Sequence, residues 1–102
     1  MKYVIGWLRM KPGKREELLV RIRPFVAQSQ KEDGVGFFEV NPSDSDPDVV
    51  VFSECYDSEE VHQRHLATPE HDALLADIAR IGIGGRFEHI YAEHRAVHNL
   101  AF

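Results

Sequence analysis

His65 is the residue best suited, by type and position, to move a proton. Val61, His62, His65 and Leu66 fall on one face of a predicted helix, so the His65 side chain is expected to point toward a sheet. A histidine can take a proton from a phenol near neutral pH without special tuning. The alternative is a structural histidine, buried and hydrogen-bonded to the backbone or to a carboxylate.

Glu54 is the second candidate, a carboxylate in a predicted strand dominated by Val, Phe and Tyr. A carboxylate in such surroundings is costly unless it is paired. It could orient His65 or bind a substrate hydroxyl, or it could pair with an arginine across a dimer. The choice depends on which face of the strand carries Glu54, and the sequence leaves that open.

Other aromatic and imidazole side chains could wall a pocket for an aromatic substrate. The candidates for substrate binding are Trp7, Phe37, Phe52, Tyr56 and His71. The alternative for each aromatic is plain core packing, which is the commoner role of such residues.

A metal site is not expected, although imidazoles are plentiful. His62, His65 and His71 could join Glu54 as ligands, but their spacing matches no compact metal motif. The single cysteine, Cys55, excludes an intrachain disulfide, and no glycine-rich phosphate loop follows a strand. We therefore predict neither a metal nor an organic cofactor.

The elements that must position these residues follow from hydrophobic periodicity. Strands are predicted over residues 3–10, 35–40, 49–56 and 86–95, with a short tail over 96–102. Helices are predicted over residues 14–31 and 59–67, the second restarting at Thr68-Pro69 and running to about residue 80. The order β-α-β-β-α-β predicts an α+β, ferredoxin-like fold with both helices on one face of an antiparallel sheet.

Length and charge narrow the class of protein. The 102 residues suit one domain spanning the whole chain, and a composition of 43% apolar and 28% charged residues is typical of a globular protein. A net charge of -5 makes nucleic acid and anionic membranes poor partners. With no apolar run long enough to span a membrane, we expect a cytoplasmic protein.

The first and third predicted strands are apolar on both faces, but helices can cover only one face of the sheet. An uncovered apolar face marks an interaction surface. A second copy of the chain, packed sheet against sheet, is the simplest partner, so we predict a homodimer.

Several short motifs occur together in a recognisable order. They are Pro12-Gly13, Glu32-x-Gly34, Glu54-x-Tyr56, His65 and Thr68-Pro69. In this order they resemble the antibiotic biosynthesis monooxygenase family of dimeric α/β-barrel proteins, over nearly the whole chain. The chain departs from the family's Pro-His pattern because Glu70 stands between Pro69 and His71.

The resemblance implies a homodimer with a pocket between sheet and helices in each subunit. It also implies oxidation of a quinol or polyphenol by dioxygen without metal or flavin, with a functional histidine at position 65. Other members isomerise phosphorylated sugars or degrade haem, so the family alone does not fix the reaction. Haem degradation is disfavoured, because the positions that resemble its Asn, Trp and His hold Gly6, His65 and Leu75.

Two other functions therefore stay open beside the monooxygenase. One is an isomerase of a small hydroxyketone, which needs acid and base groups but no oxygen. The other is a non-catalytic dimerising module for ligand binding or stress response, in which the pocket is only filled core. A pocket smaller than an aromatic ring would favour the module.

Overall fold

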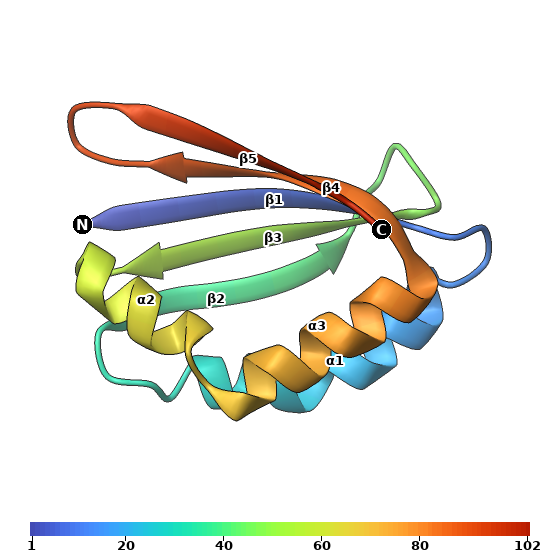
Figure 1. Cartoon of the computed structure of the whole chain (residues 1–102), viewed down its shortest axis with the longest axis horizontal. Coiled ribbons are helices and arrows are strands. Elements are labelled where there is room, and N and C mark those ends of the chain that lie inside the picture. The colour runs from blue at the N-terminus through green and yellow to red at the C-terminus, as the bar shows by residue number, and fades with distance from the viewer.

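The computed structural model describes all residues, Met1–Phe102, and contains eight regular elements (Figure 1). In chain order they are β1 (Lys2–Met10), α1 (Arg15–Ser29), β2 (Val35–Pro42), β3 (Val49–Tyr56), α2 (Glu59–Leu66), α3 (Pro69–Ile81), β4 (Gly82–Ile90) and β5 (Arg95–Ala101). No helix combines the length and the apolar character needed to cross a membrane.

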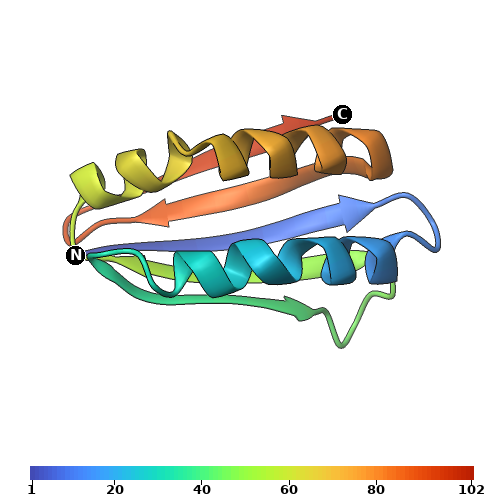
Figure 2. The ribbon, with the colours of Figure 1, turned by 90° about the horizontal axis from the view of Figure 1, so that it is seen from below.

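The five strands form one antiparallel sheet in the order β2-β3-β1-β4-β5. All three helices lie against one face of the sheet, with α2 and α3 running end to end beside α1 (Figure 2). This arrangement confirms the predicted α+β, ferredoxin-like fold.

The break between α2 and α3 comes from two helix caps that follow one another closely. The Ser58 hydroxyl accepts a hydrogen bond from the backbone N–H of Val61, which starts α2. The Thr68 hydroxyl accepts one from the backbone N–H of His71, and Pro69 occupies the first turn of α3. The break therefore sets His65 in the last turn of one helix and His71 in the first turn of the next.

The C-terminal region differs from the prediction of a strand over 86–95 and a tail. Instead, β4 spans Gly82–Ile90 and the expected tail is a further strand, β5, paired along it. A Cβ at Gly84 would overlap the carbonyl oxygen of Leu100, so this glycine permits close pairing of β4 with β5. The turn between β4 and β5 was missed because residues 91–94 contain neither Gly nor Pro.

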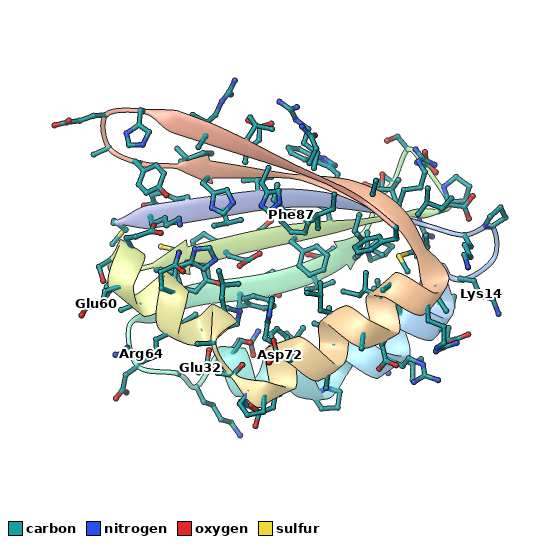
Figure 3. All side chains as sticks on the ribbon, viewed as in Figure 1. Lys14, Glu32, Glu60, Arg64, Asp72 and Phe87 are labelled. Atoms are coloured by element: carbon teal, nitrogen blue, oxygen red, sulfur yellow. The ribbon has the colours of Figure 1, made fainter.

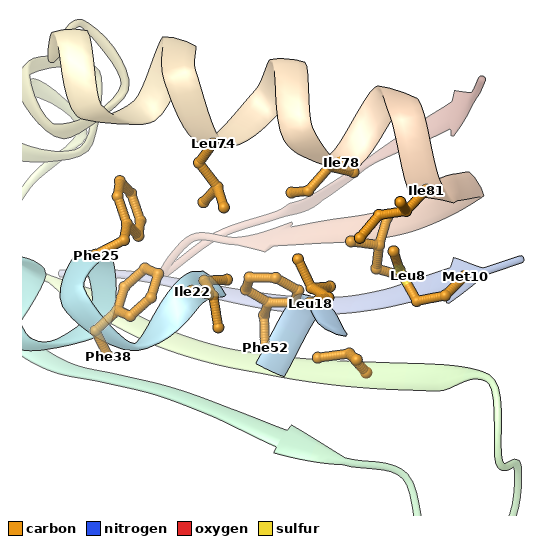
Figure 4. Packing of buried hydrophobic residues seen from close by; sticks show 11 residues of the cluster. Leu8, Met10, Leu18, Ile22, Phe25, Phe38, Phe52, Leu74, Ile78 and Ile81 are labelled. Carbon is orange, nitrogen blue, oxygen red and sulfur yellow. The ribbon is translucent and has the colours of Figure 1, made fainter. Parts of the chain in front are cut away.

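The core lies between the helices and the inner face of the sheet. Leu74, Ile78 and Ile81 of α3 face Leu8 and Phe52 of the sheet across this layer (Figure 4). The core cluster comprises Leu8, Met10, Leu18, Ile22, Phe25, Phe38, Val50, Phe52, Leu74, Ile78 and Ile81. It occupies the space under α1 and α3, so α2 and the end of the sheet beneath it carry the polar groups.

The close pairing at Gly84 gives a test of the fold. Gly84→Ala is expected to lower the free energy of unfolding by about 1–3 kcal/mol, because β5 must move away from the added methyl group. Urea denaturation measures the change, and Glu93→Ala at the exposed turn of the same hairpin is the control. If Gly84→Ala is as stable as the control, β5 does not pair with β4 in this register.

Candidate functional site

A cavity of about 250 Å³ lies between the sheet and helices α2 and α3. Phe87 of β4 lies on the side of the sheet that faces the helices (Figure 3). In the same view, Glu32 lies beside the junction of α2 and α3. Most lining residues are hydrophobic, and the polar ones are Glu54, His62, His65, His71, His89 and His98. An apolar cavity of roughly 150 Å³ can hold benzene, so this one has room for a substituted aromatic ring.

Strand register separates the cavity into a polar end and an apolar end. Val4 of β1 is paired with Glu54 on one side and His89 on the other, so all three side chains project from the same face of the sheet. Further along β1, the rings of Phe52 and Phe87 lie 5.5 Å apart beside Gly6. A Cβ at Gly6 would overlap the Phe87 ring, so the glycine makes room for this wall of the cavity.

His65 is held by a carboxylate at one ring nitrogen. Its Nδ1 lies 2.7 Å from Oε1 of Glu32, and the rings of Phe25 and Phe38 pack against it. A neutral imidazole that donates Nδ1–H to Glu32 has a free acceptor at Nε2. Nε2 has no partner within the protein, and His65 lines the cavity, so this nitrogen is available to a bound ligand.

Glu54 points to the inner face of the sheet, which settles the question that the sequence left open. The Tyr56 hydroxyl donates a hydrogen bond to Oε1 of Glu54, and Tyr56 itself is fully buried on the same face of the sheet. Glu54 and His65 share no hydrogen bond, so the idea that Glu54 orients His65 is wrong. Glu32 holds His65 instead, and Glu54 is buried on the inner face of the sheet, where an arginine of another chain could not reach it.

Burial governs the protonation of the polar end. It raises the pKa of Glu54 from 4.5 to about 7, although the Tyr56 hydrogen bond and the Lys2 charge oppose the rise. Burial, aided by Lys2, lowers the pKa of His62 from 6.5 to about 3. Burial also lowers the pKa values of His71 and His89. At neutral pH these three imidazoles are therefore uncharged, and Glu54 exchanges its proton readily.

The structure brings together only part of the predicted site. Phe52 and His71 line the cavity, whereas Tyr56 does not line it and lies beside Glu54 on the same face of the sheet. Trp7 and Phe37 do not belong to it: they are 39% and 43% exposed on the outer face of the sheet. They were misplaced because neighbouring strand residues point to opposite faces, and both faces carry aromatic residues.

Two residues of the site, Glu32 and His89, were not expected from the sequence, and His62 was considered only as a metal ligand. Glu32 lies 33 positions before its partner His65, and only the Glu32-x-Gly34 motif hinted at a special role. His89 lines the polar end because the register of β4 against β1 turns its side chain to the inner face, and His62 lines it from the helix face already expected to point toward the sheet. No three His, Cys, Asp or Glu side chains converge as a metal-ligand set would.

Comparison with known proteins identifies the class to which this fold and site belong. Residues 1–77 match the family described as antibiotic biosynthesis monooxygenase. The chain belongs to this family. A search of curated proteins finds no match.

Solved structures with low sequence identity share the fold. A candidate antibiotic biosynthesis monooxygenase from Deinococcus radiodurans superposes with a TM-score of 0.84 at 18% identity, over 90% of this chain and 92% of that one. A second candidate monooxygenase, from Nitrosomonas europaea, gives 0.77 at 23% identity over 97% and 95%. A protein from Shewanella oneidensis gives 0.82 at 18% identity over 94% and 90%.

The protonation of Glu54 predicts how stability depends on pH. Between pH 4.5 and about 7 the folded chain keeps a proton on Glu54 that the unfolded chain has released, so raising the pH through this range lowers stability. The difference between the two pKa values corresponds to about 3 kcal/mol. His62 acts in the opposite direction between pH 3 and 6.5, because its folded pKa is the lower one.

Comparison with Glu54→Gln isolates the contribution of Glu54 to the pH dependence of stability. The stability of Glu54→Gln relative to the unsubstituted protein is expected to rise by about 3 kcal/mol from about pH 4 to about pH 8, measured by urea denaturation. Phe87→Leu changes the same cavity wall without changing a titratable group, and its relative stability should not vary with pH. A flat profile for Glu54→Gln would mean that Glu54 ionises normally in the folded protein.

Proposed function

We propose that this protein is a cofactor-independent monooxygenase that oxidises a quinol or polyphenol with dioxygen. The observation that carries the proposal is the His65–Glu32 pair, which offers an imidazole nitrogen to an apolar cavity large enough for an aromatic ring. Membership of the antibiotic biosynthesis monooxygenase family supports a monooxygenase activity in general. The small aromatic molecule is the partner inferred for the cavity.

The first step is removal of a proton from the substrate. A phenolic O–H in the cavity donates to Nε2 of His65, and the proton passes to this nitrogen. The Glu32 carboxylate at Nδ1 stabilises the imidazolium that forms, as a buried carboxylate does beside a catalytic histidine. The resulting phenolate is electron-rich at the ring carbon that reacts with dioxygen.

The oxygen step balances without an external reductant. The ring carbon forms a bond to one oxygen atom, giving a hydroperoxide. Loss of that carbon's hydrogen and cleavage of the O–O bond then give a quinone carbonyl and one molecule of water. The substrate supplies all four electrons. Glu54, which lines the cavity and has a pKa of about 7, delivers a proton to the departing oxygen in this scheme.

The two alternatives have less support. A phosphorylated hydroxyketone needs a cation to hold its phosphate, and neither Lys nor Arg lines the cavity. A module with a merely filled core does not fit a cavity larger than an aromatic ring. Oxygen consumption separates the monooxygenase from both alternatives, because neither an isomerase nor a binding module consumes oxygen.

We also propose that the protein works as a homodimer in the cytoplasm. Tyr3, Trp7, Phe37 and Val97 leave about 40% of their surfaces exposed on the outer face of the sheet, where no helix covers them. A second copy packed on this face would bury them. The single cysteine, Cys55, is a buried free thiol, which suits a reducing compartment.

Oxygen uptake with a panel of hydroquinones and naphthols tests the function. His65→Gln is expected to keep the fold and to lower kcat by roughly 10²–10⁴-fold, because the proton acceptor is lost. Glu32→Gln keeps the imidazole but removes its anionic partner, and a smaller loss in kcat of roughly tenfold is expected.

The control is His94→Gln, which alters an exposed histidine in the turn between β4 and β5. Its oxygen uptake should equal that of the unsubstituted protein. A folded, fully active His65→Gln would show that the substrate loses its proton elsewhere. An absence of uptake with every phenol tested would contradict the monooxygenase itself.

Sedimentation at micromolar concentration tests the dimer. The expected mass is twice the 11.7 kDa of one chain. Trp7→Glu should weaken association roughly 100-fold or more, because it places a charge in the apolar contact. Val20→Glu on α1 replaces an apolar residue that is 60% exposed and should leave the dimer intact. A monomer for the unsubstituted chain would contradict the proposal.

A further inference from the structure

His62 carries the only buried side-chain nitrogen or oxygen in the protein without a hydrogen-bond partner. The atom is Nδ1, and the residue as a whole is only 2% exposed. Leaving a buried polar atom unpaired costs about 1–3 kcal/mol. A leucine or phenylalanine would fill this position on α2 without that cost, so an imidazole here needs an explanation other than packing.

The surroundings of His62 point to a ligand. Its ring packs over Tyr56 at 4.5 Å and lies 5.6 Å from the ring of His89, at the polar end of the cavity. It lies 6.4 Å from the ring of His65 and is nearly parallel to it, at 22°. The second ring nitrogen of His62, Nε2, also has no partner in the protein but is not fully buried, so a ligand atom can reach it.

The position of the ring proton follows from the burial of Nδ1. Burial and the nearby Lys2 charge lower the pKa of His62 to about 3, so the neutral ring has one donor and one acceptor. Among backbone groups, a buried N–H without a partner is rarer than a buried carbonyl without one, and we apply the same preference to this ring. The proton therefore belongs on Nε2. His62 presents a donor to the cavity, whereas His65, bonded through Nδ1 to Glu32, presents an acceptor.

We propose that His62 is a specificity residue: its Nε2–H binds a second oxygen substituent of a hydroxyaromatic ligand whose first hydroxyl lies at Nε2 of His65. The cavity then selects rings with two oxygen substituents over rings with one. The inference rests on the proposed function in one respect, because it takes the ligand to be a hydroxyaromatic. His62 then recognises the second oxygen of the ligand and does not remove its proton.

Binding measured without oxygen tests the inference apart from turnover. Under argon, titration calorimetry compares 1-naphthol with 1,2- and 1,4-dihydroxynaphthalene. The tighter-binding diol is expected to bind the unsubstituted protein about tenfold more tightly than 1-naphthol, the effect of one hydrogen bond. In His62→Phe, which keeps a flat ring without nitrogen, the diol and 1-naphthol should bind equally well.

The control is His98→Phe, because His98 also lines the cavity but is exposed on β5. It should keep the tenfold preference. Loss of the preference in both variants, or its survival in His62→Phe, would overturn the inference. If the diols bind as expected but no phenol supports oxygen uptake, the proposed function fails and the recognition by His62 stands.

Two further measurements test the role of His62 without comparing the affinities of variants. The melting temperature of His62→Phe should be no lower than that of the unsubstituted protein, because the unpaired nitrogen is gone. In the unsubstituted protein, the Nε2 resonance of His62 should shift when the diol is added and stay in place with 1-naphthol. An equal response to both ligands would contradict a contact with the second oxygen.

Discussion

The alternation of side chains along the central strand β1 is the constraint on which the rest of the molecule depends. One set of positions, including Val4, Gly6 and Leu8, faces the helices, and the other, including Tyr3 and Trp7, faces outward. Because β1 is paired with both β3 and β4, it also fixes which of their residues reach the cavity. A shift of one residue in this register would turn Glu54 and His89 outward and close the site.

The cavity is possible because the core and the polar end occupy different parts of the same layer. Aliphatic and aromatic side chains pack tightly under α1 and α3, which supplies the stability of the fold. The break between α2 and α3 brings the ring centroids of His65 and His71 within 6.1 Å of one another. Both rings lie over the end of the sheet that carries the polar groups. There the protein tolerates a buried carboxyl and an unpaired imidazole nitrogen, both of which lower its stability.

Two faces of one sheet thus serve different purposes. The inner face holds a mostly apolar cavity with proton-exchanging groups at one end. The outer face exposes aromatic and aliphatic residues that no helix covers. Trp7 and Phe37 fit the outer role, and Phe52 and Phe87 fit the inner one. Composition does not separate the two groups, because aromatic residues serve both faces.

Local patterns in the sequence were enough to predict the order of the first seven elements, the position of β3, the helix restart at Thr68-Pro69 and the inward direction of His65. These follow from local periodicity and caps, which act over a few residues. Three features could be seen only in the folded chain: Glu32 holds His65, Glu54 faces the cavity, and residues 95–101 form a strand. Each of these depends on strand register or on the path of a loop, which brings together residues far apart in the chain.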